Sequence, residues 1–276
     1  MKTEIIDLYK YFGLPRPKGS KGYLTTYIID KYNEFCPNRV RPAMVVIPGG
    51  GYSYCSQRES EPIALYFLSN GYNAFVLDYS VAPVAYPQQL LEACMAIAYV
   101  KLNAKEFGVD DKHVAAIGFS AGGHLTGMLA TMFNEQPVLD ALKDKAPLCR
   151  PDAVILSYPV ITAGEFEHKG SIDNLSGGDE VLRPTLALET RVTKHSSPAF
   201  IWATANDGAV PCENSFLMAL AYRKNGVPFE LHVFEDGVHG LSLSTAEVNT
   251  PNEPVAKWKE MAITWLKLKG FDINNN

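Results

Sequence analysis

The sequence predicts an α/β fold, in which a mostly parallel, doubly wound sheet carries helices on both faces. Short apolar segments of strand type alternate with longer segments of helical period along most of the chain. Most of the apolar segments are continuous, as in strands that are buried on both faces. The length of 276 residues and the apolar fraction of 47% suit one large core. Because no repeat or linker interrupts the pattern, we expect a single domain over residues 1–276.

The first half of the chain shows the alternation clearly from residue 44 onward. Residues 1–40 give weaker signals, although Leu24–Tyr32 is rich in Thr, Tyr and Ile and is predicted as an edge strand. The sequence then predicts strands at Met44–Pro48, Asn73–Tyr79 and Lys112–Phe119, and helices at Glu59–Asn70, Pro87–Phe107 and Ala121–Phe133. Gly71 and Gly108 follow two of these helices, where glycine commonly ends a helix.

The second half continues the alternation around one irregular segment. The sequence predicts strands at Asp152–Tyr158, Ala199–Thr204 and Phe229–Phe234, and helices at Cys212–Asn225 and Val255–Lys269. Residues 159–197 lack clear periodicity and are polar. We expect them to form a lid-like insertion, a small polar excursion over the rim of the sheet, with a short helix near Thr185–Arg191. A long excursion inside a compact domain usually has a function.

Charge and cysteine content narrow the expected partners and location. The net charge is −5 without a basic block, so neither nucleic acid nor an anionic membrane surface is an expected partner. The N-terminus has no apolar signal core, and no apolar run is long enough to cross a bilayer. The cysteines are odd in number, far apart and without a C-x-x-C pair: Cys36, Cys55, Cys94, Cys149 and Cys212. Cys94 and Cys212 are expected to pack as small hydrophobic groups, and the protein to be reduced, soluble and cytoplasmic.

The segment Gly118-Phe119-Ser120-Ala121-Gly122 matches the pattern G-x-S-x-G between a predicted strand and a predicted helix. A strand that turns at once into a helix leaves no room for β-carbons beside the turning residue. The turn also holds its central residue in a strained conformation, with the hydroxyl raised above the sheet. A capping serine at a glycine-rich helix start is the simpler interpretation. The flanking elements favour Ser120 as a nucleophile.

Three glycines follow the buried strand that ends at Pro48. A flexible loop would explain Gly49–Gly51, but so would a backbone that must approach a ligand with its N–H groups exposed. Its place directly after a buried strand favours the second interpretation. We therefore expect the N–H groups of Gly50, Gly51 and Ala121 to form an oxyanion hole.

A serine nucleophile needs a base and an acid, which this kind of fold places in the chain order serine, carboxylate, histidine. Ser120, Asp207 and His239 fit that order, and each directly follows a predicted strand, where ligands bind in parallel sheets. Asn-Asp-Gly is also good turn chemistry for Asp207. Glu213 and Asp236 are the alternative acids. The remaining histidines lie in or beside other elements: His113, His124, His168, His195 and His232.

These motifs resemble those of α/β-hydrolase esterases, in the branch related to hormone-sensitive lipase and to bacterial acetyl esterases and acetylxylan esterases. The matching segments are Pro48–Gly51, Leu77–Pro83, Gly118–Leu125, Trp202–Pro211 and Gly237–Leu241. The resemblance implies an α/β-hydrolase fold with the triad and oxyanion hole named above. The family commonly has histidine where this chain has Pro48, which puts the rigidity of the glycine loop in doubt. The N-terminus is also too short and irregular for the helical cap of the lipase relatives.

The resemblance implies a serine carboxylic ester hydrolase for short acyl esters, with acetylated sugars or xylan fragments as expected substrates and an acyl-enzyme on Ser120. Tyr52, Val210 and Leu241 are expected to line the pocket by their positions alone. No metal or other cofactor is expected, and the partner is a small-molecule ester. A formamidase or small peptidase with the same triad is the alternative, as is a non-catalytic binding protein. A homo-oligomer is also open.

Overall fold

The computed structural model describes residues 1–31, 34 and 38–274. Its centre is one eight-stranded sheet in the order β1-β2-β4-β3-β5-β6-β7-β8. The strands are β1 (Ile5–Asp7), β2 (Tyr23–Tyr27), β3 (Arg41–Ile47), β4 (Asn73–Asp78), β5 (Val109–Phe119), β6 (Ala153–Ser157), β7 (Ala199–Thr204) and β8 (Phe229–Phe234). Strands β3 to β8 run parallel, whereas β2 is antiparallel to both β1 and β4. The expected mostly parallel sheet is confirmed.

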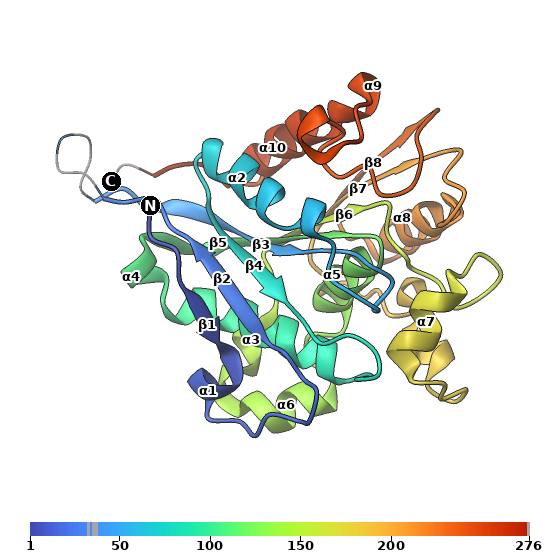
Figure 1. The fold of residues 1–276 in the computed structure, drawn as a ribbon, viewed down its shortest axis with the longest axis horizontal. Helices are drawn as coiled ribbons and strands as arrows, with labels where there is room; N and C mark the ends of the chain where they lie inside the picture. Colours follow the sequence, from blue (N-terminus) through green and yellow to red (C-terminus); the bar gives the residue numbers. More distant parts are fainter. Residues whose placement is uncertain (32–33, 35–37, 275–276) are drawn as a thin grey trace.

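Helices cover both faces of the sheet. In Figure 1, α2 (Glu61–Ser69) and α10 (Trp258–Leu268) lie above it, and α3 (Gln88–Leu102) and α6 (Gln136–Leu142) lie below it. The other helices are α1 (Leu8–Phe12), α4 (Ala104–Phe107), α5 (Ala121–Thr131), α7 (Lys169–Ser176), α8 (Glu213–Asn225) and α9 (Glu253–Ala256). Among the described residues, no helix is long and apolar enough to cross a membrane.

The continuous apolar strands supply two separate cores because alternate side chains point to opposite faces. In β3, Val45 and Ile47 belong to the core under α3 and α5, while Met44 and Val46 belong to the core under α2 and α10. All four are fully buried. A run without polar alternation was therefore the correct sign of a two-sided strand.

Several elements differ from the sequence-based expectation. The N-terminal segment forms β1 and α1, which extend the edge of the sheet and do not cap the strand ends. The predicted strand Leu24–Tyr32 is observed as β2, and its last residue lies outside the described residues. The helix predicted at Pro87–Phe107 is interrupted at Asn103, whose side-chain amide donates to the carbonyl oxygen of Tyr99 at 2.8 Å. Helix α6 was not predicted.

The cysteines agree only in part with the expectation. Cys94 is fully buried in the core, as expected, and Cys149 is buried as well. Cys212 is only half-buried, with its Sγ 3.8 Å from a carboxylate oxygen of Glu213. All the cysteines in the described part of the chain are free thiols, and Cys36 lies outside it.

The excursion at residues 159–197 is a packed cover and not a purely polar one. Its only α-helix is α7, whereas the short helix expected near Thr185–Arg191 is a pair of 3-10 turns, Arg183–Leu186 and Leu188–Thr190. Apolar residues of the segment are buried: Val160, Ile161, Ile172, Leu175, Leu186 and Leu188. Irregular spacing hid them, because no single helix or strand carries them all. Helix α7 lies on the side of the molecule opposite the N-terminus (Figure 1).

Candidate functional site

The nucleophile turn joins β5 to α5. Ser120 has φ 54° and ψ −119°, a left-handed conformation that a non-glycine residue adopts only where its surroundings impose it. Its N–H donates to the carbonyl oxygen of Ser157 at 3.0 Å. A β-carbon on Gly118 would lie 2.0 Å from the carbonyl oxygen of Gly122, and one on Gly122 would lie 2.3 Å from that of Pro48. The spacing of the motif thus has the steric cause expected from the sequence.

Three side chains that are far apart in the sequence form one hydrogen-bonded chain. The Oγ of Ser120 lies 2.8 Å from Nε2 of His239, and Nδ1 of the same imidazole lies 2.6 Å from Oδ2 of Asp207. The parallel strands β5, β7 and β8 place these residues at one edge of the sheet. The Asp207 contact fixes Nδ1 as the protonated ring nitrogen and leaves Nε2 free to accept the hydroxyl proton.

The Asp207 side chain is almost completely buried, with 1% of it exposed. Burial raises the pKa of Asp207, but the hydrogen bond and charge of His239 and the N–H groups of Val210 and Ala209 outweigh burial, so the pKa lies below its ordinary value. Those N–H groups donate to Oδ1 at 3.0 and 2.9 Å. Asp207 is therefore held as a carboxylate that faces the imidazole.

The alternative acids and bases are engaged elsewhere. Asp236 accepts from the side chain of Asn206, and Glu213 lies beside Cys212. His113 and His232 pair with Asp110 and Glu230.

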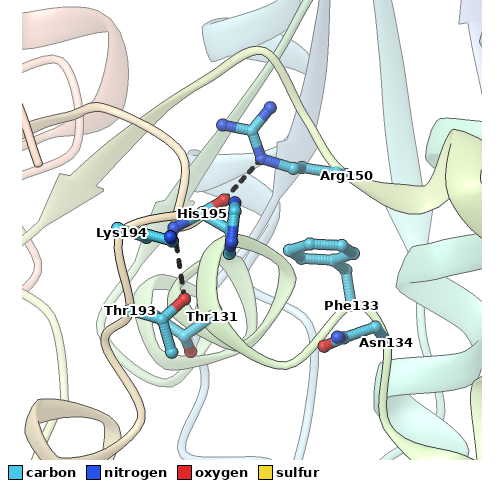
Figure 2. A pocket seen from close by; sticks show the side chains of 7 residues that line it. All are labelled: Thr131, Phe133, Asn134, Arg150, Thr193, Lys194 and His195. Carbon is cyan, nitrogen blue, oxygen red and sulfur yellow. Dashed lines mark hydrogen bonds between the residues drawn. The ribbon is translucent and has the colours of Figure 1, made fainter.

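Two further histidines also lie away from the Ser120 hydroxyl. His124 is fully buried between Tyr52 and the carbonyl oxygen of Leu186, and burial lowers its pKa to about 4. His195 lines a second cavity of about 500 Å³ with Arg150 and Lys194 (Figure 2). Those residues precede β6 and β7, so this basic cavity lies at the opposite edge of the sheet from Ser120.

The proposed oxyanion donors are backbone groups without a protein partner. Among the described residues, no hydrogen bond uses the N–H of Gly50, Gly51 or Ala121. Gly50 and Gly51 have φ of 124° and 62° and line the cavity that contains Ser120. Ala121 begins helix α5, where unpaired N–H groups favour negative charge.

The glycine loop is held without the histidine that the related esterases carry. The hydroxyl of Tyr79 donates to the carbonyl oxygen of Pro48 at 2.7 Å. The N–H of Gly49 donates to Oε2 of Glu59 at 2.8 Å, and the side-chain amide of Asn174 donates to the carbonyl oxygen of Gly51 at 2.8 Å. The side chain of Ser53 donates to the carbonyl oxygen of Gly50 at 2.8 Å as well, so each residue from Pro48 to Gly51 is bound by a different side chain.

The cavity at Ser120 has a volume of about 300 Å³ and is lined mainly by residues with polar side chains and by glycines. Besides Ser120, His239, Gly50 and Gly51, the lining includes Ser53, Tyr54, Ser56, Arg58, Glu59, His168 and Gly240. The three residues expected to line the pocket lie elsewhere. Tyr52 is fully buried with its hydroxyl 2.9 Å from Nδ1 of His124, Leu241 is in the core beside α10, and Val210 packs in a small cluster with Val160 and Ile172. Position in the sequence alone could not distinguish a residue that lines the cavity from one that is buried behind the lining.

Sequence reasoning missed Glu59, Arg58 and His168. Glu59 is one of several charged residues at the start of a predicted helix, and nothing local distinguishes it as the buried one. His168 belongs to the excursion and accepts from the N–H of Ser171, which it caps at the start of α7. Burial, then the charge of His239, lowers the pKa of His168. No cluster of three or more potential metal ligands is present in the described part of the chain.

The sheet order, the nucleophile turn and the Ser120–His239–Asp207 chain define an α/β hydrolase. The match to a known family is more specific, because residues 30–221 fit the model of the family described as BD-FAE. The chain belongs to the BD-FAE family.

Similar proteins include enzymes of xylan breakdown. The chain is 38% identical over 261 residues to endo-1,4-beta-xylanase B of Butyrivibrio fibrisolvens, which covers 87% of this chain and 41% of that protein. It is 29% identical over 211 residues to an acetylxylan esterase of Xylanibacter ruminicola, covering 74% of this chain and 42% of the relative. The chain therefore spans about two fifths of these relatives.

A solved structure matches over its whole length. The acetyl ester-xyloside bifunctional hydrolase of Caldicellulosiruptor lactoaceticus is 36% identical, with a TM-score of 0.82. The alignment covers 98% of this chain and 97% of that one. The similarity thus extends through the excursion and the N-terminal strands.

Proposed function

We propose that this protein is a serine carboxylic ester hydrolase that acts through an acyl-enzyme on Ser120. One observation carries the proposal: the Ser120 hydroxyl is hydrogen-bonded to an imidazole that a buried carboxylate orients, at 2.8 and 2.6 Å. Gly50 and Gly51, whose N–H groups are free among the described residues, line the same cavity as Ser120. This arrangement serves acyl transfer, because it activates a hydroxyl and stabilises the oxyanion that its attack creates.

In the first half-reaction, Ser120 Oγ attacks the carbonyl carbon of the ester while Nε2 of His239 accepts its proton. The carbonyl oxygen becomes an oxyanion, for which the N–H groups of Ala121 and of Gly50 or Gly51 are the donors. Asp207 stabilises the imidazolium that forms. His239 then gives the proton to the alcohol oxygen as the ester bond breaks, leaving the acyl group on Ser120.

In the second half-reaction, water takes the place of the alcohol. Nε2 of His239 accepts a proton from the water as its oxygen attacks the acyl carbon, and the same donors hold the second oxyanion. Return of the proton to Ser120 Oγ releases the carboxylic acid. No step requires a group outside this chain other than substrate and water.

The lining of the cavity favours a short acyl group on a polar alcohol. Ser53, Ser56 and His168 offer hydrogen-bonding groups, and exposed Tyr54 offers a ring face for a sugar. Beside the triad, Val160 and Val210 pack against Ile172, and their N–H groups bond to Ser120 and Asp207. This filled space leaves little room for a long acyl chain.

Acetylated sugars are therefore the proposed substrates. The names of the acetylxylan esterase and of the acetyl ester-xyloside hydrolase support this substrate class. We also propose a cytoplasmic location, which the free thiols of the described cysteines support, and which fractionation of the native cells would test.

The test is hydrolysis of p-nitrophenyl acetate, butyrate and octanoate and of an acetylated xylose by the wild type and by Ser120→Ala. We expect turnover of the acetyl esters, a decline with acyl length, and a loss of at least about a thousandfold in the mutant. A folded wild type that hydrolyses none of these esters would refute the proposal. Turnover that survives in Ser120→Ala would remove Ser120 from its role.

A further inference from the structure

A buried carboxylate outside the triad links the two loops that flank the nucleophile. Glu59 is 3% exposed and takes part in no ion pair among the described residues. Its Oε2 accepts from the N–H of Gly49 at 2.8 Å, and its Oε1 accepts from the hydroxyl of Tyr158 at 2.6 Å. Such a group is costly to bury unless each oxygen is satisfied, so its position calls for a reason.

The donors on the far side of this network belong to the histidine loop. The hydroxyl oxygen of Tyr158 accepts from the N–H of Ser242 at 2.9 Å, so its own proton is available for Glu59. The Tyr158 ring lies edge-on against the imidazole of His239, with centroids 5.1 Å apart. The network therefore runs from Gly49 through Glu59 and Tyr158 to the loop that carries His239.

The other end of the network lies close to the nucleophile. A β-carbon on Gly49 would lie 2.8 Å from Oε2 of Glu59 and 3.1 Å from the β-carbon of Ser120. Glu59 thus fixes the position of the Gly49 backbone relative to Ser120, and Gly49 is followed directly by Gly50. Burial raises the pKa of Glu59 above its ordinary value, although the bonds from Tyr158 and Gly49 oppose that shift. Each of the two carboxyl oxygens faces a donor.

We propose that Glu59 is a positioning residue, which holds the glycine loop and, through Tyr158, the histidine loop in register with Ser120. The proposal rests on the proposed esterase function. The resemblance implies that a histidine at the position of Pro48 would hold the glycine loop. Pro48 cannot do so, and the proposal assigns this support to Glu59. Since catalytic groups must be placed within a fraction of an ångström, loss of this register lowers the rate more than it weakens substrate binding.

The test compares Glu59→Gln with Glu92→Gln. A glutamine offers one acceptor oxygen to the two donors that face Glu59, so at least one link breaks. Glu92 is the matched control, because it is a fully buried carboxylate that accepts from Ser80 and Tyr9, away from Ser120. Thermal unfolding shows how far each variant is destabilised.

For Glu59→Gln we expect kcat on p-nitrophenyl acetate to fall by about 10- to 100-fold, with KM nearly unchanged. The Ki of a boronic acid, which mimics the tetrahedral oxyanion, should rise in parallel with the loss of kcat/KM. In Glu92→Gln the stability should fall, and kcat and the Ki should stay at the wild-type values. Tyr158→Phe removes the hydroxyl that joins Glu59 to Ser242 but leaves the bond between Glu59 and Gly49, so it should lower kcat less. It provides the test if Glu59→Gln does not fold.

An active wild type with unchanged kcat and Ki in folded Glu59→Gln, or in Tyr158→Phe in its place, would overturn the proposal. Equal losses of kcat in Glu59→Gln and Glu92→Gln would overturn it as well, because general destabilisation would then explain the loss of kcat. A wild type without esterase activity would instead refute the proposed function, and this inference with it, before any variant is compared.

Discussion

The α-carbon of Gly50 lies against the carbonyl oxygen of Tyr54, so closely that a β-carbon on Gly50 would stand 2.1 Å from that oxygen. The φ of Gly50, 124°, is also reserved for glycine. At Gly51, by contrast, the nearest atom to an added β-carbon is 3.8 Å away. The two neighbouring glycines therefore differ in what they tolerate.

We expect Gly50→Ala to lower kcat by about 100-fold, because the loop must shift and take an oxyanion donor with it. Gly51→Ala keeps its N–H and has room for the methyl group, so it should cost only about 1 kcal/mol of stability for the left-handed conformation, with a much smaller loss of kcat. Steady-state kinetics on p-nitrophenyl acetate and thermal unfolding distinguish the two. Equal kinetic losses would contradict the geometric argument.

Replacement of the buried acid Asp207 should show that its carboxylate is needed for turnover. In Asp207→Asn the side chain keeps its size but no longer fixes the tautomer of His239, and we expect kcat to fall by about a thousandfold or more. Glu213→Gln, at the alternative acid, should leave kcat unchanged because its carboxylate lies beside Cys212 and not beside an imidazole. A comparable loss in both variants would mean that the acid is misassigned.

The sequence predicts the site better where function depends on strand ends than where it depends on buried contacts. Ser120, Asp207 and His239 could be placed because each lies in the turn or loop that follows a strand, and a parallel sheet brings such positions to one edge. Glu59 could not be found, because its burial is created by Tyr158, 99 residues away, and not by any local pattern. Helix α7 was missed for a related reason, since its apolar residues Ile172 and Leu175 pack in two different clusters with residues that are distant in the sequence.

Acid should destabilise the protein through His124 before it protonates the triad carboxylate. Burial lowers the pKa of His124 from 6.5 to about 4, so between these values the unfolded chain binds the proton and the folded chain does not. The free energy of unfolding should thus fall as the pH falls from 6.5 toward 4, by at most about 1.4 kcal/mol per pH unit from this group.

Urea unfolding at pH 7, 6 and 5 measures this dependence. His124→Gln should remove that part of the slope, whatever its effect on stability at pH 7. An identical slope in the wild type and in the variant would exclude His124 as its source.

The bond from the excursion to the glycine loop gives a further prediction. The Asn174 amide on α7 donates to the carbonyl oxygen of Gly51 at 2.8 Å. Asn174→Ala should lower kcat by about 10-fold, because the loop loses one of the side chains that hold it. Asn70→Ala is the control, since this exposed residue also donates to a backbone carbonyl, that of Tyr66, at 2.9 Å, but far from Ser120. An increase in KM with unchanged kcat would show that Asn174 contacts substrate instead.

The same hydrogen bond couples the wall of the cavity to the support of the proposed oxyanion donors. Within residues 159–197, His168 lines the cavity, and Asn174 donates a hydrogen bond to the glycine loop at Gly51. Any redesign of this segment for a different alcohol therefore also alters the support of the oxyanion donors. A variant in which this segment is replaced should retain Asn174 and its distance to Gly51, because otherwise kcat will change together with substrate preference.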